Sequence, residues 1–306
     1  MKKYLKGLIH GLLIGFAFIS AMGGGTLAVI LGIYDDLVAA VSSLRKSFKK
    51  SVKYLAPILV GAIIGIVALF WPIGQFLEFQ PFISTSLFVG LTLGGLIVFR
   101  ELTKGQFKPI HILLVILGIG LVAVFGVLSW FAPELNLGTN QTLNLSALEI
   151  FLLFIIGFFA SSALIAPGIS GTMFLISIGY YNKLLLLIKT FLTFSGTDWG
   201  ISFGLLAAFG IGFIVGFFAI SKLMDFLLKR FRIPTYFTIL GLIIGQIIIS
   251  YFNGEMRPAY GLVQNPILEI SLSILMLIIG VVLSLVLLKL ANKKKRLSSG
   301  GDHDEA

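Results

Sequence analysis

The chain has 306 residues, of which 58% are hydrophobic and only 12% are charged. This composition excludes a water-soluble globular protein, in which about a quarter of the residues are charged. A membrane helix needs about 20 apolar residues, and the apolar runs of this chain are continuous rather than alternating. The sequence therefore predicts an all-α integral membrane protein with one membrane domain, residues 1–296. It has no cysteine and three histidines, so we expect neither thiolate chemistry nor a metal site or other cofactor.

The formal net charge of +10 is informative through its distribution along the chain. Membrane proteins concentrate lysine and arginine in short cytoplasmic loops. The charge therefore indicates topology, and we expect no nucleic-acid partner.

The first half begins with a broken apolar segment, residues 7–41, which Gly23, Gly24 and Gly25 interrupt. Basic clusters flank it on both sides, at residues 2–6 and 45–53. If both flanks are cytoplasmic, the segment must enter and leave the membrane on one side, as a helical hairpin does. Single membrane helices are predicted to follow at residues 55–71, 82–99 and 110–131.

The second half repeats this order. Another broken segment, residues 149–190, is interrupted at Ala166–Thr172, and helices are predicted at 200–221, 235–252 and 267–289. On this assignment 20 of the 23 basic residues and both termini are cytoplasmic, and the second hairpin opens to the outside. Hairpins that enter from opposite faces predict an inverted-topology repeat, which is typical of transporters. The repeats would span about 4–131 and about 149–290, and we expect residues 297–306 to be a disordered tail.

Two sets of residue matches support the repeat. Gly61, Gly65, Gly90 and Gly94 fall on Gly212, Gly216, Gly241 and Gly245 at one offset of 151 residues. The segment Gly25–Tyr34 also aligns with Gly171–Tyr181 when one residue of slippage is allowed. The glycines of each pair lie one helical turn apart, which predicts that they let membrane helices pack closely.

The glycine-rich breaks are the candidate binding sites. Broken helices at membrane depth expose backbone N–H groups that protein, water or a ligand must satisfy. Glycines let a phosphate approach these groups, and the hydroxyls of Thr26, Ser170 and Thr172 are placed to donate to it. The alternative is that the glycines only allow the two hairpins to pack closely where they cross.

Charged residues near membrane depth are costly, and this makes them candidates for function. Arg100 closes a predicted span, and we expect it to reach toward the phosphate. Asp35 ends the first broken helix and Glu101 follows Arg100, so both are candidates for coupling or gating. Lys183 is expected at the membrane interface, where long charged side chains extend into water.

At these two breaks the chain resembles the DUF368 family of bacterial membrane proteins, known as polyprenyl-phosphate transporters. The Pro-Gly-x-Ser-Gly motif of that family is intact in the second hairpin, at Pro167–Gly171. The first hairpin keeps Gly-Gly-Thr at 24–26 and Gly-Ile-Tyr-Asp at 32–35, whereas Ser-Ala-Met-Gly at 20–23 replaces Pro-Gly-Val-Ser. The resemblance covers nearly the whole chain.

The resemblance implies a substrate, undecaprenyl phosphate, the C55 lipid carrier of cell-wall precursors, which returns from the outer to the inner leaflet of the plasma membrane. The expected substrate site consists of the motif residues and one arginine: Gly24, Gly25, Thr26, Pro167, Gly168, Ser170, Gly171, Thr172 and Arg100. Moving one negative charge inward costs about 2.3 kcal/mol per 100 mV, so we expect a proton or another cation to accompany it. The expected partners are this lipid, the surrounding membrane lipids and a second copy in a homo-oligomer.

Two other functions stay open. Undecaprenyl-pyrophosphate phosphatases also resemble a pair of inverted hairpins, but hydrolysis needs an acid or base and a charge clamp at the reacting group. Position 171, where the phosphatase motif has arginine, is glycine here, so we predict that the protein is not an enzyme. A small-solute or ion transporter of the same architecture would need a closed polar cavity, whereas a lipid carrier needs a lateral opening to the bilayer.

Overall fold

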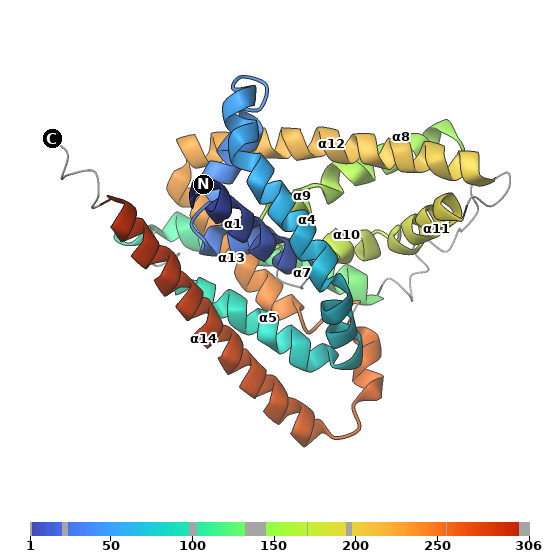
Figure 1. Cartoon of the computed structure of the whole chain (residues 1–306). Helices are drawn as coiled ribbons and strands as arrows, with labels where there is room; N and C mark the ends of the chain where they lie inside the picture. The colour runs from blue at the N-terminus through green and yellow to red at the C-terminus, as the bar shows by residue number, and fades with distance from the viewer. Residues whose placement is uncertain are drawn as a thin grey trace.

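The structure is a computed structural model, and it describes residues 2–19, 24–97, 103–131, 145–169, 171–193, 198–254 and 256–299. Every regular element in these ranges is a helix (Figure 1), which confirms the predicted all-α class. The first half contains α1 (Lys2–Ile19), α2 (Gly24–Ile30), α3 (Tyr34–Ser42), α4 (Phe48–Phe79), α5 (Pro81–Gly95) and α7 (Pro109–Phe131). The second half contains α8 (Ala147–Ala160), α9 (Ser162–Ile165), α10 (Gly171–Ser177), α11 (Tyr181–Leu192), α12 (Asp198–Arg230), α13 (Arg232–Ile249), η1 (Arg257–Leu262) and α14 (Pro266–Ser299).

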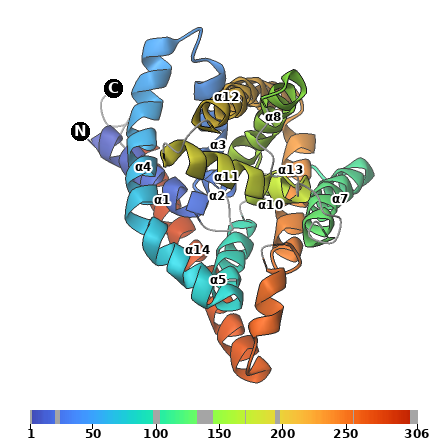
Figure 2. The same ribbon diagram turned by 90° about the vertical axis from the view of Figure 1, so that its right-hand side faces the viewer.

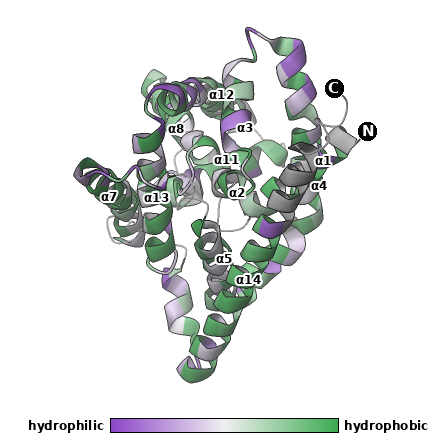
Figure 3. Cartoon of the chain, turned by 90° about the vertical axis from the view of Figure 1, so that its left-hand side faces the viewer, coloured by the Kyte–Doolittle hydropathy of each residue, from purple (hydrophilic) through white to green (hydrophobic). Residues whose placement is uncertain are grey.

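Five of these helices, α4, α7, α12, α13 and α14, are long and apolar enough to cross a membrane. The last turns of α4 and the shorter α5 form a sixth candidate span that is bent by 117°. These six correspond to the six single spans expected from the sequence. Large apolar side chains cover their outer faces: Val67, Ile116 and Ile267 are 75%, 57% and 79% exposed. Such exposed apolar side chains suit hydrocarbon rather than water, and Figure 3 shows these helices coloured mainly as hydrophobic.

Several helices extend beyond the membrane spans predicted for them. The first span was expected at residues 55–71, but α4 begins at Phe48 and continues to Phe79. Its first turns carry the exposed lysines Lys49 and Lys50, whose charged groups can stay in water, so this end of the helix can project beyond the membrane. At the other end α14 is helical as far as Ser299, and the rest of the expected tail lies outside the described residues.

Both broken segments contain a short helix that ends on a left-handed glycine. The helices α2 and α10 have seven residues each, and Gly32 and Gly179 follow them with φ of 66° and 76°. Matching hydrogen bonds close the two ends, from Ile33 N to Ala28 O at 3.0 Å and from Tyr180 N to Leu175 O at 3.0 Å. Glycine adopts this conformation without steric cost, so both turns are built the same way.

The paired glycines are close-packing positions, as predicted. A Cβ atom at Gly61 would overlap the carbonyl oxygen of Leu8, and one at Gly212 would overlap that of Phe154. α1 therefore packs on α4 in the way that α8 packs on α12. Glycine removes the side chain that would hold the two backbones apart.

The remaining long helices pair across the halves. A Cβ atom at Gly90 of α5 would overlap the backbone of α14, and one at Gly241 of α13 would overlap the backbone of α7. α5 thus packs on α14 as α13 packs on α7 (Figure 2). The turns that start α5 and α13 also match, because Ser84 and Thr235 each bond back to the carbonyl four residues earlier. Equivalent helices therefore make equivalent contacts in the two halves.

Candidate functional site

The two broken segments meet in the interior of the protein. α2 packs against α9, and the backbone N–H of Gly168 donates to the Thr26 hydroxyl at 3.1 Å. A Cβ atom at Gly25 would lie 3.2 Å from the nitrogen of Pro167, so the two loops are in van der Waals contact. The structure thus brings together four of the residues that the sequence selects, from positions about 140 residues apart.

This meeting point is closed to solvent. All seven residues of α2 are buried, Thr26 is 1% exposed, and Pro167 is among the most completely buried side chains. Gly168 has φ of 85°, and a Cβ atom there would lie 2.5 Å from the carbonyl carbon of Leu242 on α13. Only glycine combines this conformation with so close a helix, which fixes the second loop against α13.

The hydroxyl of Thr26 accepts one hydrogen bond and can still donate one. It accepts the proton of Gly168 N–H, while its own O–H proton can be donated to another acceptor. A buried N–H and a hydroxyl with a proton to donate are both suited to an anionic oxygen. The contact therefore has the chemistry that the sequence predicts for a phosphate, held in a closed form.

A tyrosine after the first short helix reaches the second broken segment. Tyr34 is the first residue of α3, is 3% exposed, and donates its hydroxyl proton to the carbonyl oxygen of Ile165 at 2.9 Å. That carbonyl belongs to the last residue of α9, just before the Pro167 loop. The contact ties the far end of the first hairpin to the entrance of the second loop.

Asp35, a candidate for coupling or gating, is paired with the start of α13. The Tyr236 hydroxyl donates to Asp35 Oδ1 at 2.6 Å, and Arg232 Nη2 donates to Oδ2 at 3.2 Å. In the sequence Arg232 reads only as one of several basic loop residues. Its pairing across the halves was not predicted, because nothing in the local pattern near Asp35 indicates a partner about 200 residues away.

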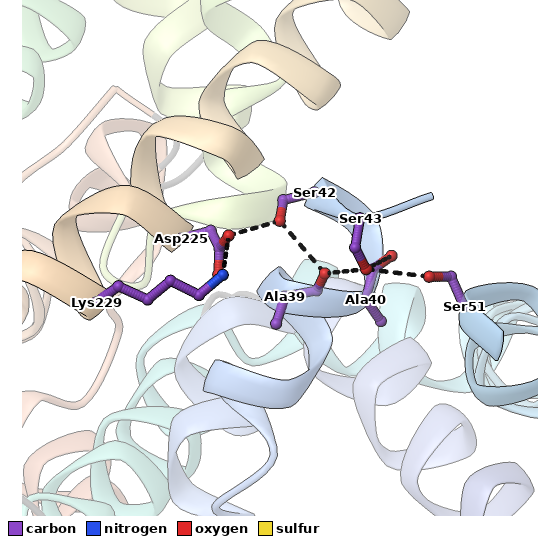
Figure 4. Close-up of polar contacts among 7 residues, drawn as sticks. All are labelled: Ala39, Ala40, Ser42, Ser43, Ser51, Asp225 and Lys229. Carbon is purple, nitrogen blue, oxygen red and sulfur yellow. Dashed lines mark hydrogen bonds and ion pairs between the residues drawn. The ribbon is translucent and has the colours of Figure 1, made fainter. Parts of the chain in front are cut away.

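A second polar contact joins α3 to α12. Figure 4 shows the Ser42 hydroxyl donating to Asp225 Oδ2 at 2.8 Å, with Lys229 Nζ at 2.7 Å from the same carboxylate oxygen. Beside it, the hydroxyls of Ser43 and Ser51 lie 3.2 Å apart and link α3 to the first turn of α4. The start of α4 and the end of α12 therefore lie at one place.

The second hairpin contains a buried ion pair. Lys183 on α11 donates to Glu149 on α8, with side-chain exposures of 8% and 17%. The expectation that Lys183 extends into water was therefore wrong, since it is paired inside the protein. The partner was not predicted, although an acid in the first turn of an apolar helix is a signal that a search for charges would find.

One more polar residue near the second loop was missed. Gln246 is buried on α13 and shares a helix face with Leu242 and Ile249. Those two residues pack in one cluster with Met173 of α10 and Ile169 of the loop. Gln246 is the one amide in a run of isoleucines, and this isolated polar residue was a usable signal.

Several predicted site residues lie where nothing is described. Ser170, Arg100 and Glu101 are outside the described residues, and the side chain of Thr172 is undescribed. Of the others, Gly24 is buried at the start of α2, and Gly171 begins α10 with its Cα facing Ala163. A role for the undescribed side chains stays a prediction.

Comparison with known proteins identifies the family. The family model for VCA0040-like proteins, described as undecaprenyl phosphate translocase-like, matches residues 16–257. The chain belongs to this family.

Two curated relatives are both named polyprenyl-phosphate transporter. The one from Staphylococcus aureus is 29% identical over 275 residues, which cover 88% of this chain and 90% of the relative. The one from Vibrio cholerae is 28% identical over 259 residues, covering 80% and 76%. No solved structure matches the chain.

Membership of the undecaprenyl phosphate translocase-like family agrees with the resemblance seen in the sequence. The matched region begins inside α1 and ends in η1, so it includes both broken segments. The long apolar helices fit a multi-pass membrane protein, and both relatives are named as transporters.

Proposed function

We propose that this protein carries undecaprenyl phosphate from the outer to the inner leaflet of the bacterial plasma membrane, for reuse in cell-wall polymer synthesis. The observation that supports this most is the buried contact between Thr26 and Gly168, where two broken helices meet in a member of the translocase-like family. Transporters place their substrates at such breaks, near the middle of the membrane.

The two halves are proposed to cross the membrane in opposite directions. α4 and α12 are equivalent, since both use matched glycines to pack on the first helix of their half. Ser51, near the start of α4, and Asp225, near the end of α12, both contact the end of α3. One helix thus starts where its equivalent ends, which supports an inverted repeat. The positive-inside rule then puts this basic end and both termini in the cytoplasm.

The phosphate is proposed to bind between the two loops and to replace the hydrogen bond from Gly168 to Thr26. Both groups then turn to the phosphate oxygens, and the other site residues are those of the two motifs: Gly24, Gly25, Pro167, Ser170, Gly171 and Thr172, with Arg100 reaching in. Anionic acceptors make stronger hydrogen bonds than a hydroxyl does, which favours this exchange. The prenyl chain stays in the bilayer along the apolar outer faces of the helices.

Transport of an anion toward a negative interior requires a driving force. The cost is about 2.3 kcal/mol for each charge at 100 mV, so we propose that a proton or another cation moves with the lipid. Hydrolysis is not proposed, because the loop residues 24–26 and 166–172 contain no arginine, histidine or acid. A pyrophosphatase needs such groups to transfer protons and to stabilise charge.

Lipid binding to the purified protein tests the proposal. The probes are undecaprenyl phosphate, undecaprenyl pyrophosphate and phosphatidylglycerol, and the variants are Thr26→Val and Ser170→Ala/Thr172→Ala. Hydrogen bonds to a charged group are worth about 1.5–3 kcal/mol, so each variant should weaken monophosphate binding at least about tenfold. Thr92→Val is the matched control, because that buried hydroxyl bonds only to its own helix at Phe88.

Two outcomes would contradict parts of the proposal. Equal binding of all three lipids, unchanged by any variant, would show that the loops serve only to pack the hairpins. Transport of the monophosphate in liposomes that ignores the pH gradient, the potential and the gradients of Na⁺ and K⁺ would exclude the coupled cation.

A further inference from the structure

The two halves differ in the contacts of α3 and α11. These helices are equivalent, because each begins with a tyrosine, Tyr34 or Tyr181, after matching glycine turns. Each packs on the long helix of its own half, α4 or α12. α3 in addition packs on α12 of the other half, whereas the described residues show no comparable packing of α11 on α4. Figure 1 shows α11 standing apart from α4.

The additional contact of α3 includes a set of polar groups, which we call the α3 latch: Asp35, Ser42, Asp225, Arg232 and Tyr236. Two hydrogen bonds to Asp35 fix the start of α3 on α13, and the Ser42–Asp225 bond fixes its end on α12. The Asp35 and Arg232 side chains are 39% and 60% exposed. Beneath these partly exposed polar groups, the buried Val38 of α3 packs in one cluster with Met224 and Leu228 of α12, so opening the contact breaks the polar bonds and separates this apolar packing as well.

The latch lies at the basic end of the molecule and restrains the closed loop contact. Tyr34, next to Asp35, bonds to Ile165 just before the Pro167 loop. While α3 is held on α12 and α13, Tyr34 keeps the first hairpin against the second loop. Release of α3 would free this connection and open the Thr26–Gly168 contact toward the basic end.

The equivalent positions on the opposite side carry complementary charges. Equivalent turn bonds after the short helices α2 and α10 are 147 residues apart in the sequence. Lys189 of α11 is therefore the equivalent of Ser42 in α3. Equivalent backbone bonds at the ends of α4 and α12 are 151 residues apart in the sequence. Glu78 of α4 is therefore the equivalent of Lys229 in α12. Lys189 and Glu78 are both exposed, and neither makes an ion pair in the part of the chain that the structure describes.

We propose that the α3 latch is the gate on the basic side, closed in this structure, and that it opens as α11 docks on α4 through Lys189 and Glu78. The two docking contacts then exclude each other, and the loop site is exposed to one side of the membrane at a time. This inference rests on the proposed function only for the identity of the cargo. The exclusion of the two contacts is a property of the protein alone.

Cysteine pairs test the gate without background, because the chain contains no cysteine. Ser42→Cys/Asp225→Cys links α3 to the other half, and the 2.8 Å contact between the native side chains places the two cysteines near enough for cross-linking. Oxidation should lower the rate of undecaprenyl phosphate transport in proteoliposomes at least tenfold, and reduction should restore it. The control is Ser43→Cys/Ser51→Cys, a 3.2 Å contact within one half, whose disulfide should leave the transport rate within twofold.

The second pair tests the exclusion itself. Lys189→Cys/Glu78→Cys should cross-link more slowly than Ser42→Cys/Asp225→Cys in the resting protein. In a protein with all four cysteines, prior closure of the Ser42–Asp225 pair with a cross-linker should suppress the other disulfide at least fivefold. This readout needs no lipid substrate, so it separates the gate from the cargo.

Unchanged transport with a complete Ser42–Asp225 disulfide would overturn the proposal. So would equal formation of the Lys189–Glu78 disulfide whether the latch is linked or free. A protein that shows the exclusion but moves no undecaprenyl phosphate, even in the unmodified form, would keep the gate and refute the proposed substrate.

Discussion

A series of three glycine substitutions separates backbone strain from steric overlap. Gly120 lies in α7 with an ordinary helical backbone, and a Cβ atom there meets nothing within 4 Å. Gly32 has φ of 66°, and its Cβ position is also empty. Gly168 has φ of 85°, and its Cβ position lies 2.5 Å from the carbonyl carbon of Leu242. Each step in the series adds one source of cost.

The magnitudes follow from these geometries. Gly120→Ala should stabilise the protein by about 0.5–1 kcal/mol, because alanine loses less backbone entropy in a helix. Gly32→Ala should destabilise by about 1 kcal/mol, the left-handed strain less the gain from a stiffer unfolded chain. Gly168→Ala adds overlap with backbone atoms that cannot rotate away, about 1–3 kcal/mol more, for a total of about 2–4 kcal/mol.

Reversible unfolding in mixed detergent micelles, followed by tryptophan fluorescence, measures the three changes in the free energy of unfolding. The order Gly120→Ala, Gly32→Ala, Gly168→Ala should be from most to least stable. Gly168→Ala should also weaken binding of the monophosphate, since the loop can no longer lie against α13. A cost at Gly168 equal to that at Gly32 would refute the close approach of the second loop to α13.

Two further substitutions test buried polar contacts. Tyr34→Phe leaves the buried carbonyl of Ile165 without its donor and should cost about 1–3 kcal/mol in unfolding free energy. Tyr181→Phe at the equivalent position should cost less than about 0.5 kcal/mol. Equal losses would contradict the Tyr34 contact. Lys183→Met leaves Glu149 without its cation in the interior and should cost about 3 kcal/mol, most of which Lys183→Met/Glu149→Leu should recover. A double variant no more stable than the single one would show that the cost of Lys183→Met does not come from leaving Glu149 unpaired.

Much of the fold was predictable because membrane helices are specified by local composition. The apolar runs located the six spans, and the interruptions at Gly23–Gly25 and Ala166–Thr172 located the two broken segments. The glycine matches at an offset of 151 residues identified the positions of closest helix packing. These signals are local because a lipid environment requires each segment to satisfy its own backbone.

The pairing of polar groups was not predictable from the same signals. Asp35 was recognised as unusual, but its partners Arg232 and Tyr236 stand where the sequence shows only a basic loop and the start of an apolar helix. The pairing depends on how the two halves are placed against each other. Hydrophobic periodicity contains no information on that placement, and two halves of similar sequence do not by themselves reveal where their contacts differ.

The contacts that are the same in both halves differ in chemistry from those that are not. The shared contacts are backbone to backbone at glycine, as at Gly61 and Gly212, and they leave no room for adjustment. The unshared contacts of α3 combine hydrogen bonds and an ion pair between partly exposed side chains with the apolar packing of Val38 on α12. Tight packing is bistable only with large rearrangement, whereas such polar contacts exchange partners easily. A protein that moves its halves as rigid units needs both kinds, and here the backbone contacts at glycine lie within the helix pairs, whereas side-chain contacts join α3 to the other half.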